Sequence, residues 1–133
     1  MSLVKEDTLK KTSENIYAYD EVLSSSNEYF NGDELAATTW MNKYAMKNAN
    51  NDFVEKSPDD MHKRMAKEFA KIEEDYKLKY NLNGSAKYLS KYGQEREDLT
   101  EHKIYSLFKN FNYIVPQGSV MSSLGNPFKL ASL

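Results

Sequence analysis

The sequence of 133 residues contains no cysteine. This absence excludes disulfides, thiolate metal sites, cysteine nucleophiles and thiyl radicals within these residues. The sequence also lacks a run of about 18 apolar residues that could span a membrane, and it lacks the apolar centre of a signal peptide. We therefore expect a soluble, cytoplasmic protein with no membrane partner.

An excess of charge of one sign is missing as well. The 18 basic residues are balanced by 20 acidic residues, which gives a net charge of −2, and both kinds are spread along the chain. Domains that bind nucleic acid typically cluster lysine and arginine on one face. We therefore expect no nucleic-acid partner.

Patterns typical of metal and acid–base chemistry are not found. A metal site in a helical bundle needs two carboxylate–histidine pairs, and Asp59 with His62 makes only one, while His102 has no such partner. We interpret Asp59 as a residue that interacts with the helix dipole and His62 as a surface or helix-packing residue. The consecutive carboxylates at 73–75 are expected on a solvated helix face. The sequence therefore predicts no metal site and no catalytic residue.

Two weaker signals for ligand binding each have a simpler explanation. No P-loop or Gly-x-Gly-x-x-Gly motif occurs, but backbone N–H groups and hydroxyls of residues 118–123 could contact a phosphate, or the segment could be a tight turn. Trp40 with nearby methionines could form a binding surface. A single tryptophan on a helical stripe is more often part of the core.

Helical periodicity dominates what is present. Asp33 and Thr100 are expected N-caps, and Pro58 suits the first position of a helix. The spacing of apolar residues predicts a small bundle of four or five helices with no internal repeat. The expected helices cover residues 19–30, 34–45, 58–80, 86–92 and 101–111.

The predicted helix that begins at Pro58 has the clearest pattern. Its apolar residues recur every three or four positions, which predicts a buried face for about four turns. Acidic residues precede basic ones by four positions on the opposite face, which favours surface ion pairs. The apolar stripe is Met61, Met65, Phe69, Ile72 and Tyr76, and the expected pairs are Asp60–Arg64, Glu73–Lys77 and Asp75–Lys79.

The segment 113–133 departs from this pattern. Prolines at 116 and 127 and glycines at 118 and 125 predict extended chain and loop rather than helix. Its small polar residues suit a backbone that lies close to a ligand. The apolar run Leu130–Leu133 has nothing to pack against, so we expect a fragment of a longer protein whose tail is mobile or packs on a neighbouring molecule. The expected organisation is a loosely ordered lead-in (1–18), an all-α domain (19–112) and this tail.

Three blocks of the sequence resemble the N-terminal part of the large, catalytic chain of ribonucleotide reductases, and most of all the adenosylcobalamin-dependent class. The blocks are YDEVLSSSNEYFNGDELAATTWMNKYAMK (19–47), EKSPDDMHKRMAKEFAKIEEDY (55–76) and FNYIVPQGSVMSSLGNPFKLASL (111–133). The resemblance implies a helical domain that leads into an α/β barrel, with a loop like PQGSVMSSLGNP that holds the substrate ribonucleotide in the active site. Ser119 matches the serine or threonine that contacts substrate in this family, and Gln117 and Gly118 are alternatives in the register.

The resemblance also implies which functions lie elsewhere in the parent chain. Ribonucleotide reduction needs a thiyl radical and a reducing cysteine pair, so this cysteine-free fragment is expected to be inactive by itself. The adenosylcobalamin and effector sites would also lie outside it. The implied partners are the barrel of the same chain, the ribonucleotide and a second copy of the chain in a homo-oligomer. The alternative is a free-standing helical module that binds a protein partner and has no enzymatic role.

Overall fold

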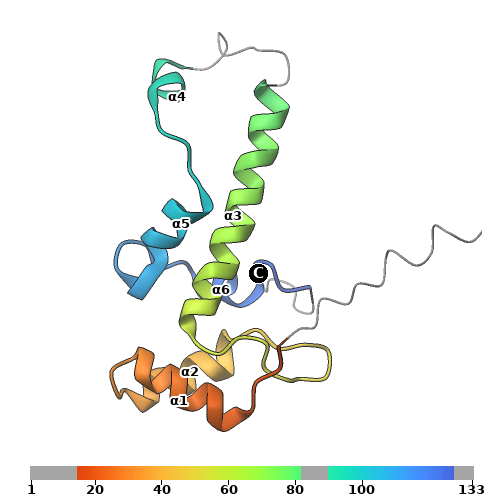
Figure 1. Ribbon diagram of the computed structural model, residues 1–133, viewed down its shortest axis with the longest axis vertical. Helices are drawn as coiled ribbons and strands as arrows, with labels where there is room; N and C mark the ends of the chain where they lie inside the picture. Colours follow the sequence, from red (N-terminus) through yellow and green to blue (C-terminus); the bar gives the residue numbers. More distant parts are fainter. Residues whose placement is uncertain (1–14, 82–89, 128–133) are drawn as a thin grey trace, which may run out of the picture.

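The computed structural model describes residues 15–81 and 90–127 of the chain, and these form a helical domain (Figure 1). The described residues contain no β-strand, although Phe53 forms isolated antiparallel bridges with Tyr17 and Lys47. The predicted all-α class is therefore confirmed. The elements are α1 (Tyr19–Tyr29), α2 (Glu34–Lys43), α3 (Pro58–Asn81), α4 (Lys91–Glu95), α5 (Glu101–Phe108), the short 3-10 helix η2 (Lys109–Phe111) and α6 (Gly118–Ser123).

Helices α1 and α2 form a tight antiparallel pair whose turn follows the sequence prediction. Asn31 and Gly32 have positive φ angles of 55° and 90°, which end α1 in the left-handed region. The Asp33 side chain then accepts a hydrogen bond from the backbone N–H of Ala36 at 3.0 Å, so the predicted N-cap is confirmed. Thr100 caps α5 in the same way by accepting from Lys103 N–H at 3.2 Å.

The core lies where the first half of α3 meets α1, α2 and α5. Its centre on α3 is formed by Met61, Met65 and Ala66, none of which exposes any surface to solvent. The indole N–H of Trp40 donates to the sulfur of Met61 at 3.2 Å, and Trp40 is 2% exposed. Trp40 is therefore a core residue, as its position on a helical stripe indicated.

The second half of α3 is less buried than the sequence pattern predicted. Ile72 is 44% exposed and Tyr76 is 54% exposed, although both continue the apolar stripe. Figure 1 shows this end of α3 extending beyond α1, α2, α5 and α6. The helix that packs along α3 is α5, and its eight residues extend over only about 12 Å. The stripe is therefore covered for two turns and then becomes an exposed apolar surface.

Two of the expected ion pairs along α3, Asp60–Arg64 and Glu73–Lys77, are replaced by pairs with other partners, most of which lie outside that helix. Arg64 pairs with Glu55 instead of Asp60. Glu73 pairs with Arg96 at 2.5 Å, while Lys77 contacts Asp98 at 3.0 Å and Glu74 at 3.9 Å. The prediction from helical spacing was wrong for these residues because the chain before α3 and the connection between α4 and α5 bring other partners within reach.

The helix between α3 and α5 differs from the one that the sequence predicted. Most of the helix predicted over 86–92 lies outside the described residues. Helix α4 runs through Gly93, which was expected to end a helix, and its N-cap is Ser90, whose hydroxyl accepts from the Gly93 N–H at 3.0 Å. A glycine near a helix N-terminus is tolerated because the serine cap stabilises the same turn.

The segment after residue 113 was predicted to be extended, and this prediction was wrong for its central part. Residues Gly118–Ser123 form α6, and Met121 and Ser122 are buried. Pro116 precedes this helix and Gly125 follows it, so the two breakers flank one and a half turns of helix instead of preventing it. This part of the tail also packs on helices of its own chain, contrary to the expected mobility. The apolar run Leu130–Leu133 lies outside the described residues.

Candidate functional site

Helix α6 is attached to α3 by the guanidinium group of Arg64. Its Nη2 donates to the carbonyl oxygen of Met121 at 2.7 Å, and its Nη1 donates to that of Leu124. These carbonyl groups lie at the C-terminal end of α6, where helix geometry leaves them without partners within the helix. One buried side chain of the long helix therefore fixes the short one, and with it the segment implied to contact substrate.

Glu55 completes this anchor from the opposite side. Its carboxylate accepts from Arg64 Nε and from the backbone N–H of Met46, the latter at 3.2 Å. Both side chains are nearly enclosed, with 9% of the Arg64 side chain and 6% of the Glu55 side chain exposed. Burial raises the pKa of the Glu55 carboxyl, and the Arg64 charge acts in the opposite direction. The ion pair joins three segments that are distant in sequence: the loop after α2, α3 and α6.

Ser119, the predicted substrate contact, lies in the first turn of α6 and is half-buried. Its carbonyl oxygen accepts from the hydroxyl of Ser122 at 3.3 Å and from that of Ser123 at 2.5 Å. Its own hydroxyl has no hydrogen-bond partner within residues 15–81 and 90–127. The Ser119 hydroxyl is therefore available to donate a hydrogen bond to a ligand or to accept one from it.

The two alternative contacts differ in their surroundings. Gly118 packs closely on the ring of Tyr44, since a Cβ atom at this position would lie 3.1 Å from Tyr44 Cε1. Gln117 is exposed and borders an apolar groove of about 480 Å³, which lies between the second half of α3, α5 and the segment before α6. Close packing accounts for the glycine, while Gln117 and Ser119 present polar groups on either side of it.

A family model described as "Ribonucleotide reductase, all-alpha domain" matches residues 30–128. The matched range begins at the end of α1 and includes Arg64, Glu55 and the whole of α6. The chain belongs to this ribonucleotide reductase family. Among curated proteins and among solved structures, no significant match to the chain is found.

His62 is a packing residue of the reductase domain, as the sequence predicted. It is fully buried, and its ring lies 4.6 Å from that of Phe111 in an edge-on arrangement and 6.3 Å from that of Phe108 in a stacked one. The Tyr29 hydroxyl accepts from the Asn110 N–H at 2.9 Å and lies 3.3 Å from His62 Nδ1, so its proton is available for that nitrogen. Burial lowers the pKa of His62 to about 4. The imidazole is therefore neutral near pH 7.

Asp59 has a more specific role in the reductase domain than an interaction with the helix dipole. Its carboxylate accepts from the Tyr105 hydroxyl of α5 and pairs with Lys63 at 2.8 Å. No group of three or more His, Asp or Glu side chains suited to a metal ion occurs in the described part of the chain. Nor do the described residues include a helix that is both long and apolar enough to cross a membrane.

The Arg64–Glu55 pair is the feature of the reductase domain that sequence analysis missed. The four-residue spacing from Asp60 predicts a surface pair for Arg64. The sequence signal for a buried Arg64 was its position beside the apolar stripe, directly before Met65 and three residues after Met61. An arginine at the border of an apolar stripe can extend its head group to a partner outside the helix.

Gly125 gives a test of how closely α6 is held against α3 in the reductase domain. Its φ is +74°, and a Cβ atom would lie 2.6 Å from Cγ of Glu68 and 3.2 Å from Cγ of Arg64. We expect Gly125→Ala to lower the free energy of unfolding by about 2–3 kcal/mol, because backbone strain and the steric conflict act together. Urea-induced unfolding followed by circular dichroism measures this change.

Gly32→Ala is the matched control for that substitution. Gly32 also has a positive φ, of +90°, but a Cβ atom there would meet nothing within 4 Å. We expect a smaller loss of about 1–2 kcal/mol from backbone strain alone. Equal losses at the two positions would contradict the close contact between Gly125 and α3.

Proposed function

We propose that this chain is the N-terminal helical domain of the large chain of an adenosylcobalamin-dependent, cytoplasmic ribonucleotide reductase. In this proposal the parent enzyme reduces ribonucleotides to deoxyribonucleotides. The domain contributes a substrate contact through Ser119, with Gln117 and Gly118 beside it. The radical and redox chemistry belongs to other parts of the parent chain.

The observation that supports this role is the rigid attachment of a short helix whose first turn carries an available hydroxyl. Arg64 fixes the C-terminal end of α6 through two carbonyl groups, and Tyr44 limits the position of Gly118. A hydroxyl held in this way needs little reordering when it meets a ligand, so more of the interaction energy remains for binding. The Ser119 hydroxyl could then form a hydrogen bond with a hydroxyl or phosphate oxygen of the ribonucleotide.

The partner proposed for the apolar groove is the α/β barrel of the same chain. Several large apolar side chains are exposed on and beside this groove, including Ile72, Leu99 and Ile114, each more than 40% exposed. An apolar surface of this kind is typical of a contact with another domain. Packing the barrel here would place it beside Gln117 and the start of α6.

Adenosylcobalamin is the cofactor proposed for the parent enzyme, where it would supply the initiating radical. No residue of this chain is assigned to holding it. The contribution of the domain is limited to positioning substrate through α6.

Substitution of Ser119 in the full-length parent reductase tests the proposal. We expect Ser119→Ala to reduce kcat/KM for the ribonucleotide by roughly tenfold, as the loss of one hydrogen bond to substrate of about 1.4 kcal/mol would do. The free energy of unfolding should change by less than about 0.5 kcal/mol, because the substituted hydroxyl has no partner in the described residues. Steady-state kinetics and urea-induced unfolding measure the two effects.

Ser24→Ala is the control for this experiment. Ser24 is exposed on α1, so its substitution should leave both kcat/KM and stability unchanged. An unchanged kcat/KM in Ser119→Ala would contradict the substrate contact. It would favour the alternative that the domain is a helical interaction module, for which the exposed apolar groove is the supporting feature.

A further inference from the structure

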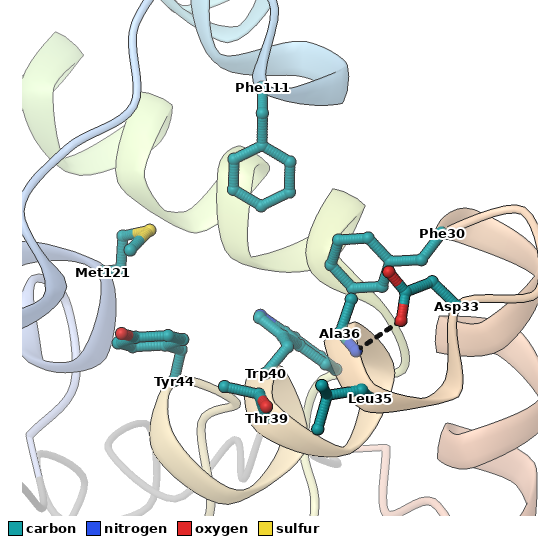
Figure 2. A pocket seen from close by; sticks show the side chains of 9 residues that line it. All are labelled: Phe30, Asp33, Leu35, Ala36, Thr39, Trp40, Tyr44, Phe111 and Met121. Atoms are coloured by element: carbon teal, nitrogen blue, oxygen red, sulfur yellow. Dashed lines mark hydrogen bonds between the residues drawn. The ribbon is translucent and has the colours of Figure 1, made fainter.

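A second hollow lies between the α1–α2 turn, α2, η2 and α6. Its volume is about 340 Å³, within the range of roughly 300–1,000 Å³ that is usual for small-molecule sites. Figure 2 shows four aromatic side chains around this space, with the sulfur of Met121 pointing into it. The four aromatic residues are Phe30, Trp40, Tyr44 and Phe111.

The charge of this hollow has one sign. Asp33 is the one ionisable acidic or basic side chain among the described residues that line it, apart from the phenol of Tyr44. One carboxylate oxygen of Asp33 accepts from the Ala36 N–H, which leaves the other oxygen for a further interaction (Figure 2). The faces of aromatic rings also carry negative potential. The site is therefore complementary to a cation and unfavourable for a phosphate group.

The position of Phe111 is maintained against backbone strain. Asn110 and Phe111 both have φ near +55°, which is rare for a bulky residue such as phenylalanine. The Asn110 N–H donates to Tyr29, and the Phe111 ring is stacked on Phe30 at 6.0 Å and lies edge-on to His62. Strained conformations persist where surrounding contacts determine them, and they are common at ligand sites. These contacts fix an aromatic wall of the hollow before any ligand arrives.

We propose that this hollow is a binding site for a small organic cation that carries an alkylammonium group. The ammonium methyl or methylene groups would contact the aromatic rings, and the charge would interact with their faces and with Asp33. The apolar lining favours a weakly hydrated cation such as a quaternary ammonium over a metal ion, which would need more oxygen ligands. This inference does not depend on the reductase function, because it uses none of the residues assigned to substrate.

Choline and 3,3-dimethylbutan-1-ol provide a direct test, because they have nearly the same shape and differ in charge. Trp40 is the only tryptophan in the sequence, so its fluorescence in the 133-residue chain reports on the hollow itself. We expect choline to bind at least about fivefold more tightly than the neutral alcohol, as cation–π contacts and one carboxylate imply. Chemical-shift changes at the Met121 methyl group would locate the ligand.

Asp33→Asn separates the charge of the hollow from the stability of the fold. Asparagine is as good an N-cap as aspartate, so α2 should remain capped. We expect this variant to bind choline about fivefold more weakly and the alcohol equally well. Glu34→Gln is the control, because it removes an exposed charge one residue away that does not line the hollow.

Three results would overturn the proposal. The first is an absence of choline binding to the unmodified chain, and the second is equal affinity for choline and the alcohol. The third is the same loss of choline affinity in Asp33→Asn and Glu34→Gln, which would show a general effect of net charge. A selective loss in Asp33→Asn alone supports the site.

Discussion

Replacing Arg64 with methionine is expected to lower the free energy of unfolding by about 3–5 kcal/mol. The substitution keeps much of the side-chain volume but removes the positive charge and the hydrogen bonds to Met121 and Leu124. It leaves Glu55 buried without its ionic partner, and an unpaired buried charge costs more than the pair contributed. Helix α6 should also lose its attachment to α3.

Urea-induced unfolding and amide hydrogen exchange measure these two consequences. We expect protection to fall most strongly for the amides of Val120, Met121 and Leu124, which form hydrogen bonds within α6 or at its end. Lys63→Met is the matched control on the neighbouring position of α3, where the side chain is 60% exposed. The free energy of unfolding of Lys63→Met should fall by less than about 1 kcal/mol. A loss for Arg64→Met as small as that of the control would contradict the anchoring role.

The Arg64→Met variant should also respond to pH in a characteristic direction. Burial raises the pKa of Glu55 above its usual value in the folded protein, and removing Arg64 removes a charge that opposes this rise. A carboxyl with a raised folded pKa favours the folded state as it becomes protonated. The stability of the variant should therefore recover in part as the pH falls through the folded pKa of Glu55 towards 4.5.

Acidification from pH 7 to pH 4 is expected to lower the stability of the unmodified protein by about 3 kcal/mol through His62 alone. The pKa of His62 is about 4 in the folded protein, and the ordinary histidine value of 6.5 applies in the unfolded chain. Between these values the unfolded chain binds a proton that the folded chain does not. Stability is therefore fully present above pH 6.5 and decreases as the pH falls towards 4. The physical cause is the enclosure of the ring by aromatic neighbours.

His62→Phe isolates this contribution from that of the carboxyl groups. At neutral pH the free energy of unfolding of the variant should be lower by about 1 kcal/mol, because Tyr29 loses a hydrogen-bond partner. Between pH 6.5 and 4 its stability should fall by about 3 kcal/mol less than that of the unmodified protein. His102→Asn serves as the control, because His102 is exposed. Parallel pH profiles for the unmodified protein and His62→Phe would show that His62 is not responsible.

Much of the fold followed from local sequence signals. Asp33 and Thr100 act as the predicted N-caps, and α3 begins at Pro58 as expected. Caps and first-turn prolines are read well from sequence because they satisfy backbone groups within the same few residues. The core position of Trp40 followed from helical spacing for the same local reason.

The candidate site could be predicted only in part. The sequence of residues 111–133 indicated Ser119 and its neighbours as a substrate contact. The family match covers these residues as far as 128. Their helical conformation was missed because α6 is too short to be stable alone and depends on Arg64 for its attachment. Arg64 is 57 residues from Met121 in sequence, so no local rule connects them.

The sequence by itself determined the all-α class, the starts of α2, α3 and α5, and the family to which the chain belongs. Tertiary structure decided which residues of each helix are buried and which ionic partners meet. The short α5 leaves Ile72 and Tyr76 exposed although they continue a buried stripe. Arg64 pairs with Glu55 and not with Asp60, because only the folded chain brings Glu55, Arg64 and α6 together. This place is largely shielded from water, so each charged group there needs hydrogen-bond partners from the protein.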